Sequence, residues 1–423
     1  MFKKKHPWYR RRGYIHFDSP VALKTAHQLV TYSARVAKHA FFPLINYELE
    51  SYKLYKDDKG ELQKKEKLRP IAYASHLDSH IYAYYALQLS KLYEDKLNAL
   101  GLTENVLAFR SLGKSNIEFA NKAFEDIKAR QTCSAVALDV KGFFDNLNHQ
   151  VLKSAWSELL GESLLPADHF NVFKSLTQYA SVDKNKLYST LEIPLNNPRN
   201  GRYKVCDVKT FREKIRGEGL ISVNRENKGI PQGSPISALL SNIYMLEFDA
   251  MAKNVMEEQG GSYYRYCDDM LFITDREFRD DIEDFAQSEI IKLQLELNTS
   301  KTEIRDFWLS YGQQTSNLPL QYLGFTFDGQ RKLIRSAAFA RFSNRMKSGV
   351  RLAKKTRAKR NKQKLREGKS STPLYKRKLY ERYSHLGKRN FITYGFRAAK
   401  VMESDAIRKQ LKPFWKRLQD EFE

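Results

Sequence analysis

Apolar residues recur along this chain with two periods, which predict a mixture of helices and short strands. Spacing of three or four residues, typical of helices, marks 21–42, the second half of 68–97, and 234–256. Short apolar runs bounded by turn residues occur at 133–140 and 263–274 and indicate strands, the second folded as a hairpin. This mixed order predicts an α+β fold with a palm-like sheet covered by helices on one side.

Two segments break the periodic pattern. Residues 56–67 are polar and predict a turn. Residues 181–228 are rich in Asn, Lys and Gly without a clear period, so we expect an insertion or a mobile hairpin there. "LQYLGFTFDGQRKLI" predicts two short strands around a turn, and from residue 341 the pattern is helical. With 423 residues, two or three packed units are expected.

Positive charge is concentrated at one end of the chain. The formal net charge is +24, and residues 331–423 hold 29 Lys or Arg against 7 Asp or Glu, a net of +22 (29 − 7). Such a field suggests a polyanionic partner, either nucleic acid or an anionic membrane surface. The lack of a long uncharged apolar run argues against a membrane.

The start of the chain and its cysteines bear on the compartment. "MFKKKHPWYRRRGY" lacks the apolar core of a signal peptide, so we expect a cytoplasmic protein. Cys133, Cys206 and Cys267 lie far apart without zinc-site spacing, which supports neither a disulfide framework nor a zinc module. Reduced thiols are consistent with the cytoplasm.

Two adjacent acids, Asp268 and Asp269, stand at the tip of the hairpin predicted at 263–274. Tight turns favour Asp, so a solvated acidic tip is one interpretation. The other is a metal site, because adjacent carboxylates resist joint ionisation unless a cation lies between them. Asp139 ends the strand at 133–140. If the two strands are neighbours, three carboxylates meet at one sheet edge, a ligand set suited to two Mg²⁺ ions for phosphoryl transfer.

Five motifs resemble those of one enzyme family in order and spacing. "ALDVKGFFDNLNH", "GIPQGSPISALLSNIYM", "YRYCDDMLFI", "LNTSKTEI" and "LQYLGF" are similar to the palm motifs of reverse transcriptases, and "KLRPIAYASHLDSHIYAYYA" with "LAFRSLGKS" resembles their fingers motifs. The resemblance implies a right-hand polymerase fold. It divides the chain into an N-terminal extension with fingers (1–130), a palm (131–330, with 181–228 inserted) and a basic helical thumb (331–423).

The resemblance also assigns catalytic roles. Asp139, Asp268 and Asp269 correspond to the metal-binding triad, with the Val140 carbonyl as a further ligand for magnesium. Lys301 aligns with the lysine associated with the departing pyrophosphate, where an ammonium serves as general acid or as a charge clamp.

Other positions match the nucleotide site. Arg69 and Lys67 correspond to fingers residues that hold the triphosphate, although a lysine in a polar turn is often only solvated. Phe144 matches the aromatic gate against a ribose 2′-OH, the alternative being a core aromatic. Its neighbour Phe143 is expected in the core, on the other face of an extended segment. Gln232 matches the residue near the incoming nucleotide, but Pro-Gln-Gly is also an ordinary turn.

The primer and the RNA have their own predicted contacts. Tyr322, Leu323, Gly324 and Phe325 resemble the primer grip, and a buried hairpin is the competing account. Basic side chains recur at helical steps within 345–369, with Met346, Val350 and Leu352 supplying apolar contact. Between 356 and 364 a solvated arm competes with a helix. The expected RNA-binding residues are Arg351, Lys354, Lys355 and Arg357.

The resemblance extends to a subgroup. "RRGYIHFD", the segment 181–228 and the lack of a fused domain are most similar to the "unknown group" of bacterial defence-associated reverse transcriptases, which implies antiphage defence with a dedicated, structured noncoding RNA template, dNTP substrates and a cDNA product. Alternatives are a group II intron or retron-type enzyme and a maturase-like RNA-binding protein with a spent polymerase fold. An RNA-templated RNA polymerase is a further rival, against which Phe144 argues.

Overall fold

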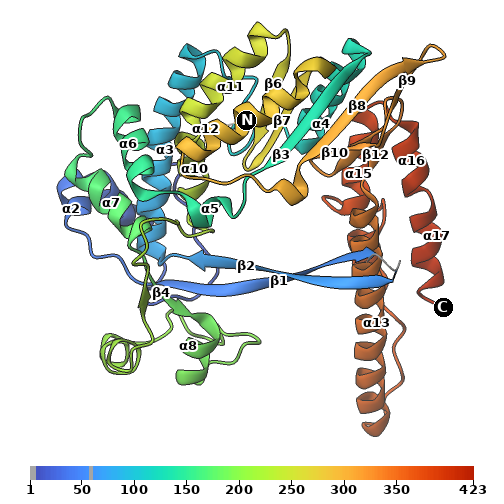
Figure 1. The fold of residues 1–423 in the computed structure, drawn as a ribbon. Helices are drawn as coiled ribbons and strands as arrows, with labels where there is room; N and C mark the ends of the chain where they lie inside the picture. The colour runs from blue at the N-terminus through green and yellow to red at the C-terminus, as the bar shows by residue number, and fades with distance from the viewer. Residues whose placement is uncertain (1–5, 57–60) are drawn as a thin grey trace.

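The computed structural model describes residues 6–56 and 61–423 and confirms the predicted α+β class (Figure 1). A five-stranded sheet in the order β6-β7-β3-β8-β9 lies at the centre, and every pairing in it is antiparallel. Its strands are β3 (Cys133–Asp139), β6 (Ser262–Tyr266), β7 (Asp269–Thr274), β8 (Glu303–Ser310) and β9 (Gln313–Ser316). The strand predicted at 133–140 and the hairpin at 263–274 are therefore confirmed.

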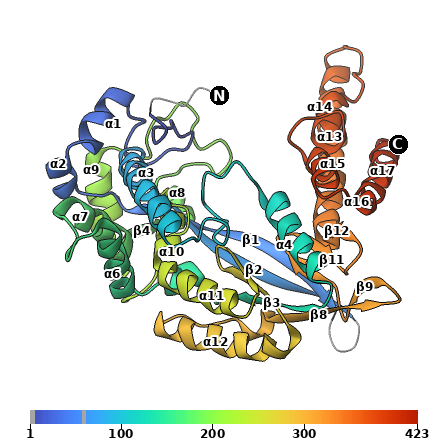
Figure 2. The same ribbon diagram turned by 90° about the horizontal axis from the view of Figure 1, so that it is seen from above.

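Both faces of the central sheet are covered, so the prediction of helices on one side only is wrong. From β3, Val136 and Leu138 join one apolar core and Cys133 and Ala135 join another. Because alternate residues of a strand face opposite sides, a strand that is apolar at nearly every position needs a partner layer on each face. Figure 2 shows α11 and α12 on one side of the sheet and α4 (Asn116–Arg130) on the other.

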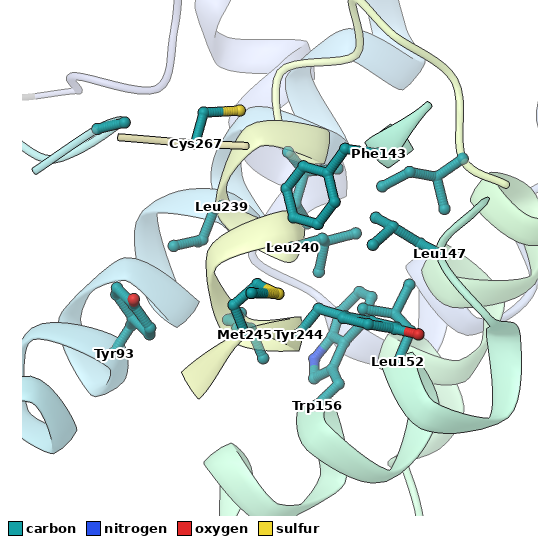
Figure 3. Close-up of a cluster of buried hydrophobic side chains, with 14 of the residues drawn as sticks. Tyr93, Phe143, Leu147, Leu152, Trp156, Leu239, Leu240, Tyr244, Met245 and Cys267 are labelled. Atoms are coloured by element: carbon teal, nitrogen blue, oxygen red, sulfur yellow. The ribbon is translucent and has the colours of Figure 1, made fainter. Parts of the chain in front are cut away.

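The first core is built mainly by helices. They are α3 (His76–Ala99), α6 (His149–Leu160), α7 (Ala167–Thr177), α10 (Ser237–Tyr244), α11 (Leu246–Glu258) and α12 (Arg279–Lys292). Figure 3 shows Trp156, Tyr244 and Leu240 packed together with Phe143 from the one-turn helix α5 (Phe143–Asn146). Full burial of such large side chains contributes roughly 1.5–3 kcal/mol each. This core fixes the loop after β3, where Asp139 lies.

A second sheet has the order β2-β1-β4-β5. Its strands are β1 (Leu44–Lys56), β2 (Leu62–Tyr73), β4 (Ala180–Asp183) and β5 (Ser222–Val223), and β1 and β2 form a long antiparallel ribbon. The predicted turn at 56–67 is too long, because β2 already begins at Leu62. Residues 57–60 lie outside the described residues. Two short helices, α1 (Leu23–Val30) and α2 (Ser33–Ala37), confirm the helical pattern at 21–42.

The segment 181–228 packs against β1 and the N-terminal residues, so the expectation of a mobile hairpin is wrong. Strand β4 pairs in parallel with β1, and the segment continues as α8 (Lys184–Thr190), α9 (Val208–Thr210) and the π-helix η1 (Phe211–Gly217). Its side chains Leu187 and Ile215 are fully buried with Ile45 from β1 and Ile15 from the N-terminal extension. Apolar residues too sparse to show a period therefore form a third core.

A three-stranded sheet lies between the central sheet and the C-terminal helices in the chain. Its strands are β10 (Leu320–Tyr322), β11 (Phe325–Phe327) and β12 (Lys332–Ile334), so the predicted pair gains a third strand. The helices after it are α13 (Ser336–Arg366), α14 (Arg377–Tyr383), α15 (Phe391–Val401), α16 (Asp405–Leu411) and α17 (Pro413–Asp420). These elements share the second core with helix α4 (Asn116–Arg130) and the central sheet. The C-terminal helices thus share one core with α4 and the central sheet.

Helix α13 bears on two predictions: the conformation of residues 356–364, and the apolar contacts of Met346, Val350 and Leu352. Residues 356–364 continue the helix, so the helical alternative is confirmed, and most of these residues are exposed on it. Met346 and Val350 are buried as predicted. Leu352 was expected to supply apolar contact, and this prediction is wrong, because its side chain is 66% exposed. Leu352 lies two residues beyond Val350 and is therefore turned by about 200° around the helix axis relative to Val350, on the side away from the core.

Candidate active site

Three carboxylates meet at one edge of the central sheet. Asp139 ends β3 and Asp269 begins β7, and the two residues are direct partners in the antiparallel ladder. Asp268 precedes β7, and its carbonyl accepts a hydrogen bond from the Val140 N–H at 3.2 Å. Directly opposed residues of such a pair have Cβ atoms only about 4.5–5.5 Å apart. The predicted convergence of the acids is confirmed.

The turn that presents these acids is strained and held from behind. Cys267 has a φ of +63°, an unfavourable conformation for a residue with a side chain. Its carbonyl accepts a hydrogen bond from Arg265 at 3.1 Å, and the Arg265 guanidinium forms a bidentate ion pair with Asp249 on α11, both side chains being fully buried. Asn242 accepts a further bond from Arg265. The guanidinium therefore ties the strained turn to two helices.

Asp139 is held by two residues of the connection after α12. The Lys301 ammonium lies 2.7 Å and 2.6 Å from the two oxygens of its carboxylate. Asn298 donates its backbone N–H to the Asp139 carbonyl at 2.7 Å and its amide to a carboxylate oxygen at 3.4 Å. Lys301 was predicted at the site, whereas the roles of Asn298 and Arg265 were missed. The amide in "LNTSK" was an available signal for Asn298, whereas no local pattern pointed to the role of Arg265.

Negative charge crowds at the turn. Desolvation by the surrounding protein, followed by the charges of Asp268 and Asp139, raises the pKa of Asp269 to about 7, although this residue remains exposed to solvent. The cation of Lys301 acts in the opposite direction. A carboxylate that is disfavoured by its own neighbours is a position where added positive charge is stabilising.

The ligand chemistry of these residues fits magnesium, which prefers hard carboxylate and carbonyl oxygens. In the described ranges 6–56 and 61–423, however, no three His, Cys, Asp or Glu side chains are gathered closely enough to hold a metal ion. One reason is visible: Lys301 already occupies both oxygens of Asp139. The backbone brings the acids together, and the carboxylate of Asp139 is paired with the Lys301 ammonium.

The predicted nucleotide residues lie on three neighbouring elements. Burial and the charges of Arg69 and Lys301 lower the pKa of Lys67 on β2, and the charges of Asp139 and Asp268 oppose this shift. Lys67 therefore lies within electrostatic reach of the acids. Because alternate residues of a strand share a face, Arg69 lies on the same side of β2.

Gln232 lies between β2 and helix α5. Its carbonyl accepts the Ala72 N–H at 2.7 Å, and its side-chain amide lies 3.5 Å from the Asp145 carboxylate. Phe144 is half-buried and Phe143 is buried, as predicted. Phe143 was expected in the core because it would face the other side of an extended segment from Phe144. That reason is wrong, since both residues lie on a one-turn helix. The Phe144 carbonyl accepts the Ile230 N–H at 2.9 Å, which joins this helix to the loop of Gln232.

The predicted primer grip forms a tight hairpin turn. Tyr322 pairs with Phe325, and Leu323 and Gly324 between them both have positive φ, as a type I′ turn requires. Tyr322 and Phe325 are buried in the second core, so the buried-hairpin account holds for these two side chains. Gly324 is exposed at the tip. The Leu323 carbonyl accepts a hydrogen bond from Asn116 at 2.9 Å.

The predicted RNA-binding residues lie along helix α13. Arg351, Lys355 and Arg357 are exposed and Lys354 is half-buried. A hollow of about 580 Å³ is lined by three of these residues, Lys354, Lys355 and Arg357, together with Lys376. The exposed basic side chains of α13 form a surface suited to a phosphate backbone.

No helix within the described residues is long and apolar enough to cross a bilayer.

Several telomerase structures are similar to this chain: that of apo telomerase from Candida tropicalis truncated from the C-terminal domain (13% identity, 74% of this chain, 60% of that chain, TM-score 0.41), the apo enzyme of the same species (14%, 78%, 57%, 0.40), and telomerase from Candida albicans in complex with a fragment of telomeric RNA (14%, 77%, 55%, 0.39). The chain spans about three fifths of the length of these telomerases.

A family comparison is more specific. Residues 56–327, well over half of the chain, match the family described as reverse transcriptase (RNA-dependent DNA polymerase). The match contains the three carboxylates, Lys301 and the nucleotide residues on β2 and α5. This chain belongs to the reverse transcriptase family.

Proposed function

We propose that this protein copies an RNA template into DNA with magnesium at the acidic sheet edge. The observation that carries the proposal is the register of β3 with β7, which makes Asp139 and Asp269 direct partners within a chain of the reverse transcriptase family. Asp139, Asp268, Asp269 and the Val140 carbonyl would hold the metal, which when bound supplies Lewis-acid stabilisation of the phosphate and of the attacking and leaving oxygens.

The other residues orient the substrate. Lys67 and Arg69 bind the triphosphate from β2, and the Phe144 ring packs beneath the sugar. Lys301 is half-exposed, so its ammonium can turn from Asp139 towards a departing pyrophosphate and donate a proton or balance its charge. A primer annealed to RNA, incubated with dNTPs and Mg²⁺, tests the proposal: extension that stops with EDTA is expected, and no extension on any RNA template would contradict it.

The polymerase serves antiphage defence with a dedicated, structured noncoding RNA. Support comes from the likeness of "RRGYIHFD" and of the segment 181–228 to defence-associated reverse transcriptases, and from the basic thumb, which suits a structured RNA partner. Sequencing the nucleic acids that copurify with the protein before and after phage challenge tests this. One enriched RNA species with its cDNA is expected, whereas a random cellular RNA population would contradict the proposal.

Sugar selection provides a sharper test of the site. Phe144→Ala removes the ring that crowds a ribose 2′-OH, so we expect kcat/KM for ribonucleotides to rise relative to deoxyribonucleotides by roughly 10- to 200-fold. Phe144→Tyr keeps the bulk and should keep the discrimination. Single-nucleotide incorporation kinetics measure both. If the ratio is unchanged in the alanine variant, sugar selection lies elsewhere.

The thumb surface has a salt-dependent signature. Substituting Arg351, Lys354, Lys355 and Arg357 together with Gln should weaken RNA binding and reduce the slope of log K against log salt by roughly 0.7–0.9 for each phosphate that is no longer neutralised. The matched control removes the same charge from exposed positions of α9 and η1: Lys209, Arg212, Lys214 and Arg216. Equal slopes for the two variants would show that α13 does not hold the RNA.

A further inference from the structure

Asn116, the first residue of helix α4, connects two parts of the chain that are distant in sequence. Its side-chain amide donates hydrogen bonds to the Leu323 carbonyl and to the Tyr394 hydroxyl, each at 2.9 Å. Leu323 lies in the turn between β10 and β11, and Tyr394 lies on α15. The amide nitrogen of asparagine carries two hydrogens, so each bond can use its own hydrogen. The side chain therefore bridges a hairpin turn and a C-terminal helix.

The same turn is tied to the C-terminal helices from a second side. The Gly324 carbonyl accepts the backbone N–H of Arg335 at 3.1 Å, and Arg335 is the residue that caps the start of α13. Both carbonyls of the turn, those of Leu323 and Gly324, are thus bonded outside the hairpin. A displacement of α13 or α15 would consequently be transmitted to the turn.

The first turn of α4 holds the bridging amide in place. Ser115 and Glu118 form a capping box, in which the Ser115 N–H donates to the Glu118 carboxylate at 2.8 Å. Arg397 donates to Glu118 at 2.6 Å and to the Ser115 hydroxyl at 3.2 Å. Because Tyr394 and Arg397 are three residues apart, they lie on the same face of α15. That face therefore meets the start of α4 at two points.

This network is connected to the acidic sheet edge through packed side chains. Tyr266, the ladder partner of Asp269, packs against the second core, which contains Tyr322 and Phe325 on either side of the turn. The Tyr394 ring is stacked on that of Phe325, with 6.3 Å between the ring centres. Close-packed side chains of this kind deform little, so the place of the turn relative to the acids depends on what holds the turn.

We propose that Asn116 is a positioning residue for DNA synthesis. It sets the distance between the hairpin turn and helix α15, so that an RNA held by the C-terminal helices and a primer end held by the turn are presented together to the acidic sheet edge. The inference rests on the proposed function, because it takes the turn at Leu323 and Gly324 to contact the primer. Misplacing reacting atoms by about 1 Å can cost roughly 100-fold in rate, so a hydrogen bond far from the phosphate can control synthesis.

The test removes the two bonds with little change in shape. Asn116→Asp keeps the size of the side chain and removes both donors. With saturating dNTPs and Mg²⁺, the single-turnover rate of primer extension on RNA should fall by roughly 10- to 100-fold. The dissociation constant of the annealed primer, measured by fluorescence anisotropy, should stay near the wild-type value, because α13 is unchanged. Tyr394→Phe removes one of the two bonds and keeps the ring against Phe325, so it should cause a smaller fall in rate.

The matched control is Asn98→Asp, the same change at an exposed asparagine of α3, which should leave rate and affinity at wild-type values. A merely structural role of Asn116 would lower the melting temperature without changing the rate per active molecule, as counted by the burst amplitude. That outcome would overturn the inference. An equal loss of affinity and rate would also overturn it, since it would place Asn116 in the surface that holds the RNA.

Hydrogen exchange separates this inference from the proposed function, because it needs no synthesis. Backbone amides of residues 320–327 should exchange faster in Asn116→Asp than in the wild-type protein, whereas those of β3 should be unchanged. Equal exchange of 320–327 in the two proteins would overturn the inference even if synthesis fell. Failure of the wild-type protein to extend any primer would contradict the proposed function, and the exchange result would still decide whether Asn116 holds the turn.

Discussion

Replacing Asp268 and Asp269 with alanine should abolish DNA synthesis while RNA binding survives. The two side chains provide most of the negative charge at the sheet edge, and Asp269 is the ladder partner of Asp139. Without them a bound cation loses two of its ligands, and several kcal/mol of charge stabilisation at the phosphate are lost. This corresponds to a fall in rate of about 10³-fold or more. Primer extension measures the rate, and filter binding of the template measures affinity.

The chain offers a matched control for this variant. Asp280 and Asp281 form a second adjacent pair, exposed at the start of α12 and away from the acidic edge. Alanine at both positions removes the same charge and should leave synthesis within a few-fold of wild type. Undiminished synthesis by the Asp268 and Asp269 variant would remove the basis of the polymerase proposal, whereas loss of RNA binding together with synthesis would indicate a folding defect.

Arg265→Met is expected to cause the largest loss of stability among single substitutions in the palm. The change leaves the Asp249 carboxylate fully buried without its cation, a situation that typically costs about 3–5 kcal/mol. It also removes the hydrogen bond to the carbonyl of the strained Cys267. Urea-induced unfolding measures the free energy of unfolding, and a decrease in that range is expected.

The double variant Arg265→Met with Asp249→Leu separates the two roles of the guanidinium. Removing both charges should recover much of the stability, because no buried charge is left without a partner. Activity should not recover in parallel, since the carbonyl of Cys267 still lacks the donor that holds the turn. Full recovery of both properties would show that Arg265 serves the core alone and does not position the acids.

Sequence patterns predicted the parts of this fold that depend on strong local signals. The apolar run at 133–140 and the paired acids in "YRYCDD" placed β3, the β6–β7 hairpin and the meeting of Asp139 with Asp269. Long-range packing was harder to predict. The segment 181–228 has few apolar residues, and its order depends on Ile15 and Ile45, which are distant in sequence. A period calculated within the segment carries no information about such partners.

The candidate site also combines residues that local motifs predict with residues whose roles depend on distant contacts. Residues in recognisable motifs could be named from the sequence: Lys301 lies against Asp139 and Gln232 beside Asp145, while their roles stay predictions. Arg265 was missed because its function depends on Asp249 and on the conformation of Cys267, neither of which is visible in a local pattern. The contact of Lys301 with both oxygens of Asp139 likewise could be seen only in the structure.

The core shared by palm and thumb has a consequence for how this protein is made. Cys133 and Ala135 on the central sheet are covered by a core whose members extend to Phe414 and Leu418. A ribosome adds about 5–20 residues per second, so the side chains of α13–α17 are missing from this core for on the order of ten seconds after the last strand of the central sheet has been made, while α4 is already present. During that interval an apolar surface is available to chaperones or to other nascent chains. We expect yield in the cell to depend more on substitutions in the thumb core than their effect on the finished protein would suggest.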